Sequence, residues 1–144
     1  QAVSLGNSIE VTPLTVPHRD EYSETVGYLI SGPSKTALFI PDIDKWDKWG
    51  DDIRELVKKV DYAFLDATFF DGKEINHRDI SEIPLPFVIE SMALFKSLGQ
   101  EDRSKIHFIH FNHTNPLWTL DSEATQTVLQ AGFSIARKNM VFGL

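Results

Sequence analysis

The hydrophobic pattern of the sequence changes at Pro41, and this change constrains the fold more than any other feature. Before Pro41, apolar residues alternate with polar ones in short segments separated by polar turns, which is typical of β-strands. The expected strands cover residues 8–16, 25–31 and 36–40, and the last two form a hairpin around the Gly32–Pro33 turn. After Pro41, segments of helical and strand-like character alternate.

The second part of the chain predicts three amphipathic helices. Ile53, Leu56, Val57 and Val60 share helical spacing, a second helix runs from Pro86 to Gly99, and a third runs from Asp121, as its cap, to Gly132. Short apolar runs predict strands at 62–65, 106–111, 133–136 and 140–142, and the run at 62–65 indicates a strand buried on both faces. This order predicts an α/β fold with a mixed sheet and helices on one face.

Composition narrows the classes of function. The 144 residues are expected to form a single domain, 1–144. The net charge of −7 argues against nucleic acid as a partner, because phosphate binding needs a basic face. No apolar run approaches the roughly 20 residues of a membrane span. Without cysteine the chain has no disulfide, thiolate ligand or cysteine nucleophile. The absence of cysteine does not determine the cellular compartment.

Four ionisable side chains lie at or near the ends of expected strands: His18, Asp42, Asp66 and His110. A carboxylate directly after a buried strand is partly desolvated and needs a partner. Imidazole and carboxylate together suit zinc, manganese or iron. The spacing therefore indicates a metal site at His18, Asp42 and His110. The same spacing fits equally well with structural roles for these residues, in which Asp66 caps a turn and Asp44 belongs to a charged segment that leads into a helix.

Several separated segments resemble the second half of the metallo-β-lactamase fold, which is half of a four-layer αββα sandwich. They are residues 17–18 before the hairpin, residues 41–42 after it, and the later runs 61–69 and 108–111. The amino-acid sequences of residues 17–23, 40–46 and 112–116 are similar to those of one branch of this superfamily, the coenzyme PQQ synthesis protein B family. The resemblance covers the chain from about His18 to the C-terminus.

The resemblance implies a metal-dependent hydrolase with a small-molecule substrate. His18, Asp42 and His110 would bind one or two divalent ions, with zinc expected and manganese or iron as alternatives. A metal-activated water would attack an ester, a phosphoester or an amide. The implied catalytic group contains Asp66, which would orient a ligand imidazole, and His113, which would contact the substrate or supply a proton.

Two departures from the family pattern leave other functions open. The His-x-His-x-Asp-His motif of the superfamily is absent, which implies a missing N-terminal half or completion by another chain. Leu85 stands where relatives often carry a histidine; if that histidine is a general acid, this chain lacks it or uses His113 or His77 instead. The alternatives are a non-catalytic half-domain that pairs with another chain or with itself, and an iron-dependent oxidative step in cofactor biosynthesis.

Overall fold

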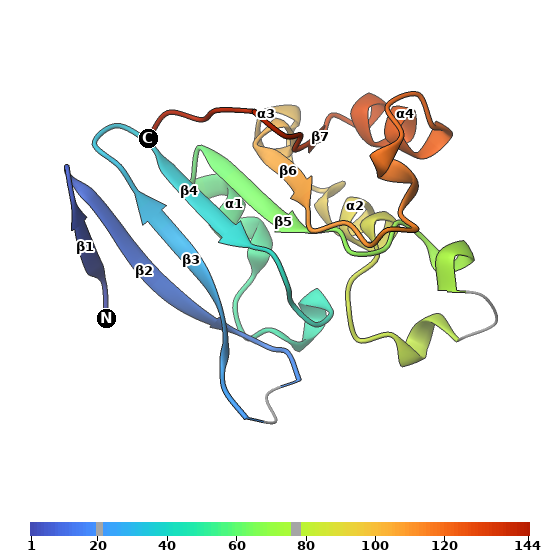
Figure 1. The fold of residues 1–144 in the computed structure, drawn as a ribbon, viewed down its shortest axis with the longest axis horizontal. Coiled ribbons are helices and arrows are strands. Elements are labelled where there is room, and N and C mark those ends of the chain that lie inside the picture. Colours follow the sequence, from blue (N-terminus) through green and yellow to red (C-terminus); the bar gives the residue numbers. More distant parts are fainter. Residues whose placement is uncertain (20–21, 76–78) are drawn as a thin grey trace.

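The structure is a computed structural model, and it describes residues 1–19, 22–75 and 79–144. Seven strands form one sheet in the order of the sequence (Figure 1). They are β1 (Val3–Gly6), β2 (Ile9–Val16), β3 (Thr25–Ser31), β4 (Thr36–Ile40), β5 (Tyr62–Asp66), β6 (Ile106–Ile109) and β7 (Ser134–Ile135). Neighbours from β1 to β4 are antiparallel, and neighbours from β4 to β7 are parallel. The predicted mixed sheet is confirmed.

Helices connect the parallel strands. Helix α1 (Ile53–Lys59) joins β4 to β5, α2 (Val88–Phe95) and α3 (Gln100–Ser104) join β5 to β6, and α4 (Glu123–Gln130) joins β6 to β7. Short 3₁₀ turns lie in the loops, at η1 (Trp46–Lys48), η2 (Gly72–Ile75), η3 (Ile80–Glu82) and η4 (Pro116–Trp118). Because successive parallel strands are adjacent and such crossovers are right-handed, the helices lie on one face of the sheet (Figure 1).

The core lies between this face and the helices. Alternate strand residues pair in register across the sheet, so that Ile40, Leu65, Phe108 and Ile135 form one buried row. The helices contribute buried side chains to the same cluster, which are Ile53, Val57, Val88, Phe95, Ala124 and Val128. The one-sided apolar pattern of each helix therefore corresponds to its place on the sheet.

The opposite face of the sheet is only partly covered. Tyr62 and Phe64 of β5 point to this face and are half-buried, so the prediction that this strand is buried on both faces is wrong. Phe142 packs here, with its ring centroid 4.9 Å from those of Phe64 and His107. Residues 140–142, predicted to be a strand, instead belong to a C-terminal segment that runs back across the sheet (Figure 1).

Some element boundaries also differ from the prediction. Strand β1 was not predicted, and it pairs with β2 through a turn in which Asn7 and Ser8 have positive φ angles. Helix α3 is separate from α2, because Gly99 has extended backbone angles. The hydroxyl of Ser122, not Asp121, caps α4 by accepting a hydrogen bond from the backbone N–H of Thr125.

No helix within the three described ranges has the length and apolar character that a membrane span requires.

Candidate metal centre

The candidate site lies where four strands of the sheet end at the same edge. Strands β2 and β4 run in the same direction, since both are antiparallel to β3, and β5 and β6 are parallel to β4. The residues that follow or end these strands are His18, Asp42, Asp66 and His110. The carboxyl edge of such a sheet is the usual place for a ligand site in α/β proteins.

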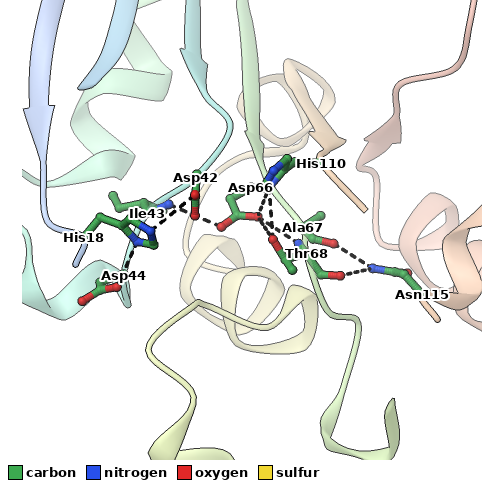
Figure 2. Close-up of polar contacts among 9 residues, drawn as sticks. All are labelled: His18, Asp42, Ile43, Asp44, Asp66, Ala67, Thr68, His110 and Asn115. Atoms are coloured by element: carbon green, nitrogen blue, oxygen red, sulfur yellow. Dashed lines mark hydrogen bonds and ion pairs between the residues drawn. The ribbon is translucent and has the colours of Figure 1, made fainter. Parts of the chain in front are cut away.

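Asp42, Asp66 and His110 converge at this edge. Each offers one potential ligand atom, and these atoms all lie within 4.8 Å of one another (Figure 2). Of the predicted set, the structure thus brings Asp42 and His110 together. It adds Asp66 as a potential ligand, whereas the family resemblance implied that Asp66 would orient an imidazole.

His18 contacts this group through Asp42 and lies outside the group of three. Its Nε2 atom is 3.4 Å from Asp42 Oδ2, and its Nδ1 atom is 3.3 Å from Asp44 Oδ1 (Figure 2). The Nδ1 and Oδ1 atoms are both buried and have no hydrogen bond of good geometry among the described residues. An imidazole protonated on Nδ1 toward Asp44 leaves the Nε2 lone pair directed at Asp42.

Asp66 is fully buried at the end of β5. Its Oδ1 atom accepts hydrogen bonds from the backbone N–H and the hydroxyl of Thr68, at 2.9 and 2.7 Å, and its Oδ2 atom accepts one from the Ile43 N–H at 3.4 Å. Burial raises the pKa of the Asp66 carboxyl, and hydrogen bonds from His110 and Thr68 oppose that rise. The carboxylate is thus fixed in position and poorly solvated.

His110 begins the loop after β6 and has a backbone φ of +63°, which a residue with a side chain rarely adopts. This angle ends the strand at Ile109, so the predicted strand 106–111 is two residues too long. The Nδ1 atom of His110 is 3.1 Å from the Thr68 hydroxyl and 3.5 Å from Asp66 Oδ1. The hydrogen bond to Asp66 raises the pKa of His110, with partial burial acting in the opposite direction.

Residues after His110 stabilise the edge without entering the cluster. Asn115 is buried, and its amide donates hydrogen bonds to the carbonyls of Ala67 and Thr68 (Figure 2). The Oδ1 atom of Asn115 also accepts a hydrogen bond from the Leu117 N–H, so its polar atoms are used within the fold. His113 is exposed on the same loop, with Nδ1 3.2 Å from Asn112 Oδ1. His77 lies outside the described residues.

Sequence reasoning missed two residues of this site. Asp44 was assigned to a charged helix approach, and Thr68 was not considered as a partner of His110. The Asp-x-Asp spacing of Asp42 and Asp44 was the available signal, because alternate residues of an extended segment can flank one imidazole. The contact of Thr68 with His110 joins loops 42 residues apart, and no local pattern indicates it.

The donor set fits a divalent cation. Asp42 and Asp66 bring two carboxylates close together, and like charges at this distance repel unless a proton or cation lies between them. The Nε2 atom of His18 adds another acceptor to the same edge. Carboxylate oxygen and imidazole nitrogen are ligands that zinc, manganese and iron share.

Comparison with known proteins assigns the class. Residues 1–111 match the family described as "Beta-lactamase superfamily domain". The chain therefore belongs to the β-lactamase superfamily. Coenzyme PQQ synthesis protein B of Methylobacterium sp. (strain 4-46) is 25% identical over 130 residues, covering 86% of this chain and 42% of that protein. The same protein of Gluconobacter oxydans (strain 621H) is 27% identical over 126 residues, covering 84% and 40%.

Solved structures show the same fold. The Zn²⁺-bound PqqB of Methylobacterium extorquens aligns with a TM-score of 0.78 and 18% identity, over 100% of this chain and 53% of that one. The metallo-β-lactamase fold protein YhfI of Bacillus subtilis aligns with a TM-score of 0.62 and 18% identity, over 99% and 52%. The predicted fold class, half of a four-layer αββα sandwich, is confirmed. The chain spans about two fifths of the length of the curated relatives it matches.

Proposed function

We propose that this chain forms part of a metal-dependent hydrolase that acts on an ester, phosphoester or amide in a small molecule. The observation that carries the proposal is the convergence of Asp42, Asp66 and His110 at the carboxyl edge of the parallel strands. The similarity to a Zn²⁺-bound PqqB supports zinc as the ion. A bound divalent ion supplies Lewis acidity at this edge.

The surrounding side chains have distinct proposed roles. His18, Asp42 and His110 would hold the ion, because Asp42 Oδ2 lies 3.4 Å from His18 Nε2 and a potential ligand atom of Asp42 lies within 4.8 Å of one from His110. Asp66 orients His110 through Thr68 and adds negative charge beside the ion. Asp44 orients His18 from the opposite side. Hydrogen bonds to a ligand imidazole fix its tautomer and increase its basicity.

Proton transfer is proposed for His113. It lies three residues after His110, its side chain is exposed, and its imidazole pairs with Asn112 alone among the described residues. An accessible imidazole can both donate and accept a proton, which is what a proton-transfer group beside a substrate requires. A substrate held beside His110 would bring its leaving group near this loop.

We also propose that residues 1–144 fold as one domain, and that a polypeptide segment outside this chain supplies further ligands. This chain aligns with only 42% of a curated relative and 53% of a solved structure, which supports this arrangement. The partly covered sheet face that carries Tyr62 and Phe64 supports it as well. The expected occupant of that face is the other half of the sandwich. A second copy of the chain or another partner chain is the alternative.

A second candidate function is an iron-dependent oxidative step. Two histidines and a carboxylate are the ligand types of many non-haem iron sites, and His18, Asp42 and His110 provide that combination. The name of the curated relatives, which refers to coenzyme PQQ synthesis, favours this candidate.

Metal analysis and activity distinguish these proposals. The chain alone and a polypeptide that includes the preceding half of the fold are purified without chelator and analysed for zinc, manganese and iron. We expect stoichiometric zinc in the longer polypeptide, substoichiometric metal in the isolated chain, and hydrolysis of 4-nitrophenyl esters or phosphates by the longer polypeptide. Asp42→Asn should lose both metal and hydrolysis. Iron with no hydrolysis would favour the oxidative step, and absence of metal from both would refute the site.

A further inference from the structure

A chain of hydrogen bonds joins Glu74, in the loop after β5, to His113, in the loop after β6. It runs through the side chains of Thr114 and Asn112. We propose that Glu74 is a positioning residue, and that this chain of hydrogen bonds holds His113 with a proton on Nδ1 and with Nε2 as the atom that exchanges protons with a substrate. The inference rests on the proposed function, because it specifies how the proposed proton-transfer group is set up.

The direction of each hydrogen bond follows from the carboxylate at one end, because a carboxylate only accepts hydrogen bonds. The Oε1 atom of Glu74 accepts one from the backbone N–H of Phe70, and Oε2 accepts one from the hydroxyl of Thr114 at 2.9 Å. A hydroxyl has a single proton, and the proton of Thr114 is used in the bond to Glu74. The Thr114 oxygen can therefore only accept from its other neighbour, Asn112.

Asn112 passes this polarity on to the imidazole. Its Nδ2 atom donates a hydrogen bond to the Thr114 oxygen at 2.7 Å. The reversed amide would place Oδ1 of Asn112 against an oxygen that has no proton left to donate, so the network selects one orientation of the amide. The Oδ1 atom then lies 3.2 Å from Nδ1 of His113 and can only accept. Nδ1 must therefore carry the proton, which leaves the lone pair of the neutral ring on Nε2.

The backbone of Asn112 connects this arrangement to the candidate metal centre. Its N–H donates a hydrogen bond to the carbonyl of Thr68 at 2.9 Å. Its carbonyl accepts hydrogen bonds from the N–H of Asn115 at 3.0 Å and from the indole of Trp118 at 2.9 Å. The hydroxyl of the same Thr68 lies 3.1 Å from Nδ1 of His110. An imidazole bound to Asn112 is therefore tied to the two loops that carry the proposed ligands.

The tautomer of His113 tests this inference in the metal-free 144-residue chain. The ¹⁵N shifts of the two ring nitrogens, recorded where the imidazole is neutral, distinguish a protonated nitrogen from an unprotonated one, and we expect the proton on Nδ1. Thr114→Val removes the hydroxyl at an exposed residue, where substitutions usually leave the fold intact, and should allow both tautomers. Thr114→Ser keeps the hydroxyl and should retain the wild-type tautomer.

Two further variants separate the network from a general effect of substitution. Glu74→Ala should also allow both tautomers, because the Thr114 proton loses its acceptor and can turn toward Asn112. The matched control is Thr127→Val, which removes a hydroxyl that donates to the carbonyl of Glu123 within α4. It should leave the His113 shifts unchanged.

Hydrolysis by the longer polypeptide tests the consequence for proton transfer. Thr114→Val should lower kcat for a 4-nitrophenyl ester about tenfold with KM unchanged, because part of the His113 population then carries its proton on the wrong nitrogen. Thr114→Ser should retain the wild-type kcat. A longer polypeptide without any hydrolytic activity would refute the proposed function, and the tautomer measured in the shorter chain still decides the present inference.

A wild-type chain with the His113 proton on Nε2 would overturn the inference. A tautomer that neither Thr114→Val nor Glu74→Ala alters would overturn it as well, as would an unchanged kcat for Thr114→Val in an active polypeptide.

Discussion

Two histidines only three residues apart, His107 and His110, lie in opposite environments. His107 is buried in the middle of β6, between the rings of Phe64 and Phe142, and its Nδ1 atom is 2.9 Å from the carbonyl of Lys105. His110 follows the strand, is about half exposed, and faces Asp66. Burial lowers the pKa of His107, whereas the hydrogen bond to Asp66 raises that of His110.

The difference shows how the end of a strand separates packing from chemistry. Inside β6 the backbone hydrogen bonds of the sheet determine which way a side chain points, and His107 is directed into aromatic contacts. Beyond Ile109 the positive φ angle of His110 turns the chain and directs the next imidazole toward two carboxylates. Backbone angles of this kind cost free energy and recur at functional sites. We therefore expect His107 to contribute to stability and His110 to metal binding.

The largest effect is expected on metal affinity. His110→Ala should reduce zinc affinity of the longer polypeptide by more than about 100-fold, because replacing a residue that only orients a ligand already costs about 10–100-fold. His107→Ala should leave the affinity of the folded protein unchanged. Competition with a chromogenic chelator measures both. Equal losses in the two variants would show that the two imidazoles do not differ in this way.

The reverse pattern is expected for stability. His107→Ala removes a buried ring from contact with Phe64 and Phe142 and should lower the free energy of unfolding by about 2 kcal/mol. His110→Ala, in the metal-free chain, should change it by less than about 1 kcal/mol, because the side chain is half exposed. Urea unfolding measured by circular dichroism provides the values. A larger loss for His110→Ala would contradict the assignment.

A smaller effect on metal binding is expected from the carboxylate behind His18. Asp44→Asn should reduce zinc affinity about tenfold, because it weakens the contact that fixes the His18 tautomer. The matched control is Asp47→Asn, which removes an exposed carboxylate from the neighbouring 3₁₀ turn. The ¹⁵N shifts of His18 should show Nδ1 protonated in the wild-type chain. No difference between the two variants would leave Asp44 without a role.

The smallest effect is a difference in the sign of pH dependence. The raised pKa of His110 gives stability that is present below the ordinary histidine pKa of about 6.5 and is lost as pH rises through the raised value. The lowered pKa of His107 gives stability that is present above that pH and is lost as pH falls through the lowered value. Urea unfolding gives the free energy of unfolding of the metal-free wild type, His107→Gln and His110→Gln at each pH. The difference between wild type and His107→Gln should change with pH in the opposite direction to the difference between wild type and His110→Gln. Slopes of the same sign would contradict the comparison.

Much of the fold was predictable because local patterns determine it. The hairpin formed by Thr25–Ser31 and Thr36–Ile40 has the predicted bounds, since alternation and the Gly32–Pro33 turn act over a few residues. Strand β1 is four residues long and exposed, and the alternation of Val3, Ser4 and Leu5 is too short to distinguish a strand from a loop. The end of β6 was misplaced because Phe111 continues the apolar pattern, while the backbone has already turned at His110.

The candidate site was predictable only in part. Asp42 and His110 follow parallel strands, and strand direction brings them to one edge regardless of side-chain detail. The contacts of Asp44 with His18 and of Thr68 with His110 depend on how separate loops pack over that edge. Long-range packing of this kind is not encoded in any single motif.

The most direct test of the metal centre is anomalous X-ray diffraction at the zinc absorption edge, from crystals of the 144-residue chain soaked in excess zinc. We predict a peak at about 2 Å from an imidazole nitrogen of His110 and a carboxylate oxygen of Asp42. Zinc bound elsewhere on the chain, with no peak between these side chains, would contradict it.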